Sequence, residues 1–300
     1  MENEQSNLVA WVVSDNKKGH ENQLSGLIEA LSLRLNITSF WLRYTGFKFF
    51  KTLPKVKPDL IICAGHGTHF RALALKLLFG GKLIVLMKPS LPSSFFDGCI
   101  IPAHDSPTEK KNIFKTLGPL NPYRPEQKDV ELPSTILLGG VSKHFYWNEK
   151  TLFSDIEVLA KRLKSPVWII GSRRTPMSTI VSLRERYSDA GLGVNVFSSE
   201  QLPADWLKQN LPKLPYIWVT QDSMNMLYEA LTVGACVGMI ELKPKKNGRV
   251  LKGTVSLLER GWVRVLDANC ELTPCDKITI PAFNESDRVA KWIIDTQLID

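Results

Sequence analysis

Residues 121–133 read NPYRPEQKDVELP, and this stretch, rich in proline and charged side chains, separates two similar halves of the chain. Such a composition is typical of a linker between domains, since proline lacks the backbone N–H group that helices and sheets require. We therefore predict a linker at residues 122–133, between an N-terminal domain of residues 1–121 and a C-terminal domain of residues 134–283. We also predict a C-terminal helix at residues 284–300, which can pack back on the N-terminal domain.

Short apolar runs on the N-terminal side of this linker predict parallel strands. The runs do not alternate between apolar and polar residues, which is typical of strands covered on both faces. They lie at residues 8–14, 37–42, 60–64, 82–87 and 99–102. Helical spacing follows the first and third runs, at residues 21–35 and 70–78.

The same alternation restarts on the C-terminal side. Strands are predicted at residues 135–138, 167–170, 194–197, 217–219, 237–240 and 262–266, and helices at 151–163, 178–189, 223–233 and 249–259. Two successive series of this kind indicate an α/β fold, in which two Rossmann-like domains with parallel sheets face a cleft.

The composition of the 300 residues restricts the class of protein. With 44% hydrophobic and 23% charged residues, the chain is neither disordered nor a coiled coil, and it can bury sizeable cores. No apolar run approaches the roughly 18–20 residues that span a bilayer, and the polar start of the chain is unlike a signal peptide. Five cysteines lie singly, without a CxxC pair, so we expect reduced thiols and a cytoplasmic protein.

The formal net charge of +8 favours an anionic partner. A nucleotide, a phosphorylated substrate, an anionic membrane surface and nucleic acid all satisfy this condition. We expect no nucleic acid, because neither a dense basic helix nor a recognisable nucleic-acid-binding module is present. The cations are spread in small clusters beside Gly-rich turns, a placement that favours small phosphates.

Ligands of parallel sheets bind beyond the carboxyl ends of the strands, where loops lead into helix N-termini. Residues 14–23 (SDNKKGHENQ) follow the first strand and contain Asp15 and His20, which are both capable of proton transfer. Gly19 allows a tight backbone there, and we place it with Gln23 along the lining of the cleft. The alternative is that Asp15 is a simple turn or capping residue.

Residues 65–69 (GHGTH) follow the third strand. Gly65 and Gly67 flank His66 and permit close approach of the backbone to a ligand. Two histidines three residues apart are similar to a metal-binding pair, but no carboxylate or cysteine lies at ligand spacing, so we expect no metal. This loop either lines the cleft or forms a structural turn.

Two Gly-containing loops of the second half have the composition of phosphate sites. Gly140, Ser142 and Lys143 can form a phosphate nest with a hydroxyl and an ammonium group, although the Walker A spacing is absent. Ser172 and Arg173 follow the next strand and bring a further hydroxyl and a guanidinium group. An exposed arginine pair is the alternative interpretation of the second loop.

Residues 219–230 (VTQDSMNMLYEA) place a strand end directly before a helix. Thr220, Asp222 and Ser223 give the mouth of this helix the density of hydrogen-bonding groups that nucleotide or sugar recognition requires. A solvated helix face would explain the polar residues equally well if the helix were exposed. The basic residues 243–249 then either hold a phosphate or form a solvated turn.

Absent motifs argue against several activities. The chain contains no DxD, so a metal-bridged diphosphate is unsupported. It contains neither GxSxG nor GxGxxG, which argues against a serine hydrolase and an ordinary NAD oxidoreductase.

The motifs SDNKKGHENQ, CAGHGTH, LLGGVSKHF, IIGSRRTP and VTQDSMNMLYEAL, in this order over roughly residues 8–260, resemble the ELM1 family. The resemblance implies a GT-B-like fold and a glycosyltransferase of cell-envelope glycans such as lipopolysaccharide, with the nucleotide-sugar in the C-terminal domain. In such enzymes an acidic residue of an EA-containing helix contacts the ribose, which assigns this role to Glu229. Asn225 and Tyr228 depart from the family pattern, so the donor base or sugar can differ.

We therefore predict a metal-independent glycosyltransferase that needs no cofactor besides its nucleotide-sugar substrate and acts on a cell-envelope glycan or a lipid-linked acceptor. Lys143 and Arg173 would neutralise the departing diphosphate, and Asp15 or His20 would deprotonate the acceptor. Aromatic and basic residues interleave at 41–57, which suits a peripheral site on the cytoplasmic face of a membrane, or else reflects core aromatics flanked by lysines. A non-catalytic membrane adaptor and a nucleotide-sugar epimerase are the alternative functions.

Overall fold

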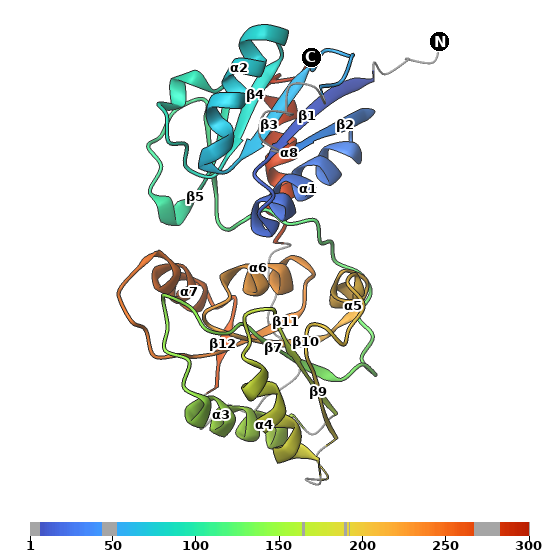
Figure 1. Cartoon of the computed structure of the whole chain (residues 1–300), viewed down its shortest axis with the longest axis vertical. Coiled ribbons are helices and arrows are strands. Elements are labelled where there is room, and N and C mark those ends of the chain that lie inside the picture. Colours follow the sequence, from blue (N-terminus) through green and yellow to red (C-terminus); the bar gives the residue numbers. More distant parts are fainter. Residues whose placement is uncertain are drawn as a thin grey trace. The chain divides into compact units, whose positions relative to one another are not determined.

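The computed structural model describes residues 7–43, 53–163, 166–188, 191, 193–266 and 283–299. It forms two compact units, one of Met1–Pro122 with Asn284–Asp300 and one of Tyr123–Phe283 (Figure 1). Each unit contains a six-stranded parallel sheet with helices, which confirms the predicted α/β class. No helix among the described residues is long and apolar enough to cross a bilayer.

The first unit contains a sheet in the order β2-β1-β3-β4-β5-β6. Its strands are β1 (Leu8–Ser14), β2 (Ile37–Arg43), β3 (Leu60–Ala64), β4 (Lys82–Leu86), β5 (Gly98–Pro102) and β6 (Ile113–Thr116). The pairing of β6 with β5 was not predicted, because a four-residue strand with a lysine and a threonine gives no clear apolar run.

Helices cover both faces of this sheet. Helices α1 (Lys18–Ser32) and α8 (Glu285–Asp295) pack on one face, where their leucine, valine and isoleucine side chains meet alternate residues of the strands. Helix α2 (His69–Phe79) packs on the other face. The described residues of this unit also form the short 3₁₀ turns η2 (His66–Thr68), η3 (Ser93–Phe95) and η4 (Ala103–Asp105).

Helix α1 begins earlier than the sequence pattern indicates. It starts at Lys18, so that Gly19 and His20 lie in its first turn and not in the preceding loop. The N–H groups of a first turn have no partner inside the helix, so a glycine there weakens the helix less than one in its interior. The early start directs the His20 side chain toward Asp15.

The second unit has the sheet order β12-β11-β10-β7-β8-β9, again with parallel pairing throughout. Its strands are β7 (Ser134–Leu138), β8 (Val167–Gly171), β9 (Val194–Phe197), β10 (Tyr216–Thr220), β11 (Cys236–Ile240) and β12 (Arg264–Val265). Helices α3 (Glu149–Arg162) and α4 (Met177–Tyr187) pack on one face. Across the sheet lie α5 (Trp206–Asn210), η5 (Leu211–Lys213), α6 (Met224–Thr232) and α7 (Arg249–Glu259) (Figure 1).

Both sheets change winding direction, the first between β1 and β3 and the second between β7 and β10. In the first unit the chain passes from β1 to β2 on one side and then to β3 on the other side of β1. In the second unit it passes from β7 to β8 and β9, and then to β10 on the other side of β7. Ligands of open parallel sheets bind at such a switch point, beyond the carboxyl ends of the two strands. The loops after β1 and β3, and those after β7 and β10, are therefore the places to search for a site.

The cysteines correct one expectation. Cys63 and Cys99 are free, and burial raises the pKa of each thiol to about 12, so both remain protonated. Cys236 at the start of β11 is disulfide-bonded, whereas the scattered spacing had indicated reduced thiols. Sequence spacing gave no sign of this bond because disulfide partners are set by the distances between residues in the fold.

Candidate functional site

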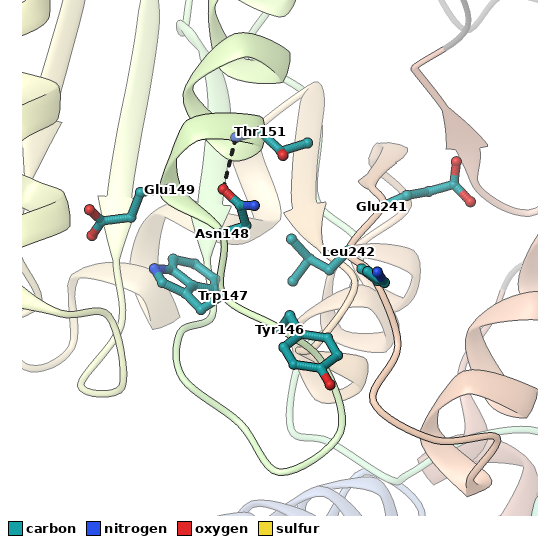
Figure 2. Close-up of a pocket in the computed structure, with 8 residues that line it drawn as sticks. Tyr146, Trp147, Asn148, Glu149, Thr151, Glu241 and Leu242 are labelled. Carbon is teal, nitrogen blue, oxygen red and sulfur yellow. Dashed lines mark hydrogen bonds between the residues drawn. The ribbon is translucent and has the colours of Figure 1, made fainter.

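The second unit contains a cavity of about 670 Å³ between the start of α3 and the segment that follows β11 (Figure 2). Its lining combines aromatic rings, carboxylates and an amine, from Tyr146, Trp147, Asn148, Glu149, Thr151, Glu241, Leu242 and Lys243. The Asn148 side chain caps α3 by accepting a hydrogen bond from Thr151 N. Burial and the charge of Glu241 raise the pKa of the nearby Asp155 carboxyl. Of these cavity residues only Lys243 belongs to a predicted candidate segment, the basic residues 243–249, because the other positions before α3 and after β11 show no motif.

Basic residues concentrate beside this cavity, where the loop after β7 meets the loop after β11. Tyr146 N donates to Lys243 O at 2.9 Å, and Lys245 N donates to His144 O at 2.8 Å, so the two loops run together. Burial lowers the pKa of His144, and the charges of four cations lower it further, namely Lys143, Lys246, Arg249 and Arg174. These cations thus surround His144 and, together with burial, favour its neutral form.

Hydrogen bonds to Ser142 stabilise the loop after β7. Lys245 Nζ donates to Ser142 O at 2.9 Å and lies 5.4 Å from the centroid of the Tyr146 ring. The Ser142 hydroxyl accepts hydrogen bonds from His144 N and Phe145 N, both at 3.2 Å. Ser142 therefore shapes the loop, whereas Lys143 is exposed and has no hydrogen-bond or ion-pair partner within the described ranges.

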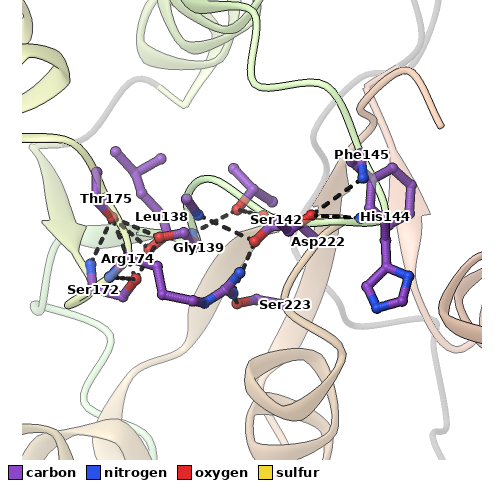
Figure 3. A network of polar contacts seen from close by, with 12 residues as sticks. Leu138, Gly139, Ser142, His144, Phe145, Ser172, Arg174, Thr175, Asp222 and Ser223 are labelled. Atoms are coloured by element: carbon purple, nitrogen blue, oxygen red, sulfur yellow. Dashed lines mark hydrogen bonds and ion pairs between the residues drawn. The ribbon is translucent and has the colours of Figure 1, made fainter. Parts of the chain in front are cut away.

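The switch point of this unit is closed by a network of hydrogen bonds between the loops after β7 and β10 (Figure 3). Gly139 N donates to Thr220 Oγ1 at 2.7 Å, and Gly140 N donates to Asp222 Oδ2 at 3.1 Å. The Thr220 hydroxyl in turn donates to Asp222 Oδ1 at 2.8 Å. The structure thus brings Gly140, Thr220 and Asp222 together, while their binding of a nucleotide-sugar stays a prediction.

The Asp222 carboxylate is the centre of the network. Its side chain is fully buried, and Arg174 contacts it from the loop after β8 at 2.8 Å. Burial raises the pKa of this carboxyl, while the hydrogen bonds from Thr220, Arg174 and Gly140 act in the opposite direction. Arg174 also donates to the Ser223 hydroxyl at 2.8 Å, so one guanidinium group binds the loop after β10 at two points.

Both glycines are required by this packing. A Cβ atom at Gly139 would collide with the Asp222 carboxylate, and one at Gly140 would collide with the Arg174 carbonyl. Gly140 also has a φ of 143°, which side-chain-bearing residues rarely adopt. The two glycines therefore let the loop after β7 lie close to the loops after β8 and β10.

The loop after β8 differs from its predicted role in part. The Ser172 hydroxyl donates to Gly139 O, and Ser172 N donates to Thr175 Oγ1 at 2.8 Å, so Ser172 braces the loops. Arg174 binds the buried Asp222, whereas the diphosphate contact predicted for Arg173 stays a prediction. Arg173 is exposed and makes no ion pair within the part of the chain that the structure describes. Neighbouring arginines look alike in sequence, and only the loop backbone decides which one points inward.

Glu229 lies on α6, in the second turn after the network. Burial raises the pKa of the Tyr123 phenol, and the charge of Glu229 raises it further, which places the two side chains near one another. A ribose contact by Glu229 stays a prediction.

The first unit places Asp15 and His20 at its own switch point. His20 Nδ1 lies 2.8 Å from Asp15 Oδ1, and Lys17 Nζ lies 3.1 Å from Asp15 Oδ2. Burial opposes the ionisation of Asp15, but the bonds to His20 and Lys17 outweigh it and lower the pKa of the carboxyl. A carboxylate paired to one imidazole nitrogen leaves the other nitrogen for proton transfer.

Gly65 joins the loop after β3 to this pair. It has a φ of 96°, and a Cβ atom there would lie 2.6 Å from Asp15 Oδ2 and 2.7 Å from His20 Nδ1. The absence of a side chain at Gly65 therefore lets the two loops meet. Gly67, in contrast, has open space around it.

The remaining predicted residues of this unit, Gln23 and His66, differ in their burial. Gln23 is buried, and its Nε2 lies 3.5 Å from Gly19 O and 3.6 Å from Met87 Sδ, so its amide fastens the first turns of α1. His66 is exposed, with its ring 5.7 Å from that of His69. His69 is buried, and its Nδ1 lies 2.8 Å from Ser90 Oγ. No group of three metal-ligating side chains occurs among the residues described.

Three solved structures have similar folds at low sequence identity. The UDP-GlcNAc 2-epimerase from Methanocaldococcus jannaschii has a TM-score of 0.60 and 12% identity, covering 97% of this chain and 100% of that chain. The co-structure of S. aureus MnaA with UDP has a TM-score of 0.53 and 11% identity, covering 97% and 89%. The glycotransferase of kitacinnamycin has a TM-score of 0.52 and 12% identity, covering 97% and 91%. These likenesses show a fold of the GT-B type, with two Rossmann-like domains.

Two comparisons of sequence identify the family. The uncharacterized protein RP120 of Rickettsia prowazekii is 26% identical over 347 aligned residues, which cover 94% of this chain and 97% of that protein. The model of the family described as mitochondrial fission ELM1 matches residues 18–296. With nearly its whole length matched, the chain belongs to the mitochondrial fission ELM1 family.

Proposed function

We propose that the protein is a metal-independent glycosyltransferase. The second unit would hold a nucleotide-sugar donor, and the first unit would supply the base for the acceptor hydroxyl. The observation that carries this proposal is the concentration of cations around His144, from the loops after β7, β8 and β11, next to a switch point closed by hydrogen bonds. The similarity of the fold to a glycotransferase and to a protein bound to UDP supports the same chemistry.

The donor diphosphate would lie against the exposed cations Lys143, Arg173 and Lys246. Positive groups held in place before the reaction stabilise the charge that develops on a departing diphosphate. Arg174 is already bound to Asp222, so its main contribution is to fix the loops in position. Glu229 on α6 would bind the ribose, as the family resemblance implies.

The sugar of the donor would occupy the cavity beside the basic loop. Tyr146 and Trp147 offer apolar surfaces to a sugar ring, and Glu241 and Lys243 offer groups for its hydroxyls. Such a mixed lining, with a few polar groups that fix orientation, is typical of small-molecule sites.

His20 is the proposed general base, with Asp15 as its positioning residue. The 2.8 Å bond between Asp15 and His20 Nδ1 orients the imidazole and leaves Nε2 to face the acceptor. His20 Nε2 would then take the proton of the acceptor hydroxyl as the sugar is transferred. The acceptor site would be lined by residues next to this pair. They are Gly19 in the first turn of α1 and Gly65, His66 and Gly67 after β3.

The acceptor would be a cell-envelope glycan or a lipid-linked sugar, reached from a membrane surface. The aromatic and basic segment predicted for this contact lies largely outside the described residues, since only its two ends at 41–43 and 53–57 are described. At one of these ends, the Arg43 guanidinium lies 5.8 Å from the centre of the Trp41 ring.

Calorimetric titration and transfer assays test the proposal. UDP-, GDP-, ADP- and CMP-sugars are titrated into the protein, and sugar transfer to envelope glycolipids is then measured. Arg173→Ala should weaken donor binding, whereas His20→Ala should chiefly lower turnover. Binding of no nucleotide would overturn the proposal and favour a non-catalytic adaptor. Wild-type behaviour of both variants would show that these two assignments are wrong.

A nucleotide-sugar epimerase is the second candidate, favoured by the TM-score of 0.60 with the epimerase from M. jannaschii. The two reactions differ in their requirement for an acceptor. Product analysis with the donor alone separates them, because an epimerase converts the sugar without any second substrate.

A further inference from the structure

Helix α2 has an uncovered apolar face in the first unit. Phe70 is 70% exposed, Leu77 86% and Leu78 67%, which makes them the most exposed large apolar side chains of any single helix described. Residues seven apart lie on the same side of a helix, and Ala74 lies between Phe70 and Leu77 on that side, whereas Leu73 packs against the buried core. The outer side of α2 is therefore a continuous apolar stripe.

The opposite side of α2 packs against the sheet. Ala72 and Leu75 are fully buried against the sheet, in the cluster that contains Trp11, Ile61 and Val85. A surface helix of a globular protein normally carries polar residues on its outer face, and a helix apolar on both sides is expected to be covered on both. The outer stripe therefore indicates a partner.

Cations gather at the C-terminal end of this stripe. Gly81, two residues after α2, approaches the Pro58 carbonyl so closely that a Cβ atom would lie 2.6 Å from its oxygen. This contact brings the segment Lys55-Val56-Lys57 toward the end of α2, where Lys82 begins β4. Both lysines of that segment and Lys82 are exposed, and the Val56 side chain between them is 53% exposed.

The nearby carboxylates are engaged elsewhere. Asp97 pairs with Lys76 at 2.7 Å, and Asp59 accepts a hydrogen bond from Val9 N at 2.8 Å. The Asp59 carboxylate keeps its charge in that bond, but the exposed Lys55, Lys57 and Lys82 outnumber it, so the edge of the stripe has a net positive charge. A second copy of the chain would bring like charges together at this face, so the charge favours an anionic surface.

We infer that the outer face of α2, with Phe70, Leu77 and Leu78, docks the first unit onto an anionic lipid bilayer. The helix has 11 residues, or about 16 Å, so it lies in the plane of the membrane surface and does not cross it. Its apolar side chains enter the boundary of the acyl chains, while Lys55, Lys57 and Lys82 meet lipid phosphates. This surface deepens the membrane part of the proposed function, and its test requires no donor or acceptor.

Flotation of the full chain with lipid vesicles tests the inference. The wild type should float with phosphatidylcholine vesicles that contain phosphatidylglycerol, less so in high salt, and weakly with phosphatidylcholine alone. Leu77→Glu and Phe70→Glu should each reduce the bound-to-free ratio about tenfold. Val181→Glu is the matched control, because Val181 is also an exposed apolar residue, on α4 of the second unit, and should change little. Unfolding curves of all variants confirm that they fold.

Three outcomes would overturn the inference. The first is equal flotation of Leu77→Glu and wild type, and the second is equal loss in Val181→Glu. The third is a concentration-dependent dimer that Leu77→Glu dissociates, which would assign the stripe to a second copy. Retained nucleotide binding in a variant that no longer floats would leave the proposed donor site intact.

Discussion

The guanidinium group of Arg174 lies 2.8 Å from the buried carboxylate of Asp222, and this ion pair joins the loop after β8 to the loop after β10. Arg174 is 44% exposed on its side chain, whereas Asp222 is not exposed at all. The buried partner is bound on its other side by Gly140 N and the Thr220 hydroxyl. The loops around the switch point are therefore fixed before any ligand binds, which is the condition for electrostatic stabilisation of a leaving group.

Asp222→Ala should reduce the free energy of unfolding by about 2–3 kcal/mol, since it leaves a buried N–H group, a hydroxyl and a guanidinium group without an acceptor. Urea unfolding monitored by tryptophan fluorescence measures this change. Asp287→Ala is the control, because it removes a partly exposed ion pair with Arg34 at 3.1 Å and should cost less than about 1 kcal/mol. Equal losses in the two variants would contradict a structural role for the Asp222 network.

Gly65→Ala should destabilise the first unit by about 1–2 kcal/mol, because Gly65 has a φ of 96° and its new methyl group would meet Asp15 and His20. The same substitution should lower transfer activity by displacing the pair. Gly67→Ala is the matched control, with open space around the added methyl group. Similar unfolding midpoints for the two variants would show that the loops do not meet at Gly65.

The positions of the strands could be predicted because apolar runs are local features of the sequence. The segments 8–14 and 60–64 coincide with β1 and β3, and the polar residues that follow them therefore fall at the carboxyl edge of the sheet. The strand order could not be predicted in the same way, because it depends on contacts between distant segments. It is this order that places the loops after β1 and β3 side by side.

The roles of individual side chains were harder to predict from the sequence. Ser172 and Ser142 have the residue type of phosphate ligands, yet the Ser172 hydroxyl binds the Gly139 carbonyl of the neighbouring loop, and the Ser142 hydroxyl binds the backbone of its own loop. Arg173 and Arg174 differ only in the direction that the loop backbone gives them. The residues around the cavity carry no motif, since a cavity is formed by packing and not by spacing. Residue type predicts where a site lies, and hydrogen-bond partners decide which groups remain for a ligand.

Lys143→Gln should weaken the binding of a nucleoside diphosphate about tenfold, or about 1.4 kcal/mol, if the exposed cations hold the diphosphate. The wild-type affinity should also fall as salt rises, and the variant should show a smaller salt dependence. Calorimetric titration at two salt concentrations measures both effects. Lys213→Gln removes an exposed lysine after α5 and should leave the affinity unchanged. An equal affinity in Lys143→Gln and wild type would remove Lys143 from the site.

His69 should make the stability of the first unit dependent on pH. Burial lowers the pKa of His69 to about 4, and the charge of His66 acts in the same direction, whereas the unfolded chain has the ordinary value near 6.5. Between these two values the unfolded state binds more protons, so the stabilising contribution of neutral His69 is present above about pH 6.5 and is lost as the pH falls toward 4. The loss is on the order of 2–3 kcal/mol, which urea unfolding at several pH values across this window detects. His69→Gln removes the titrating group and should flatten the profile, whereas His66→Gln, at the exposed neighbour, should keep it. A profile of His69→Gln as steep as that of the wild type would show that another group titrates.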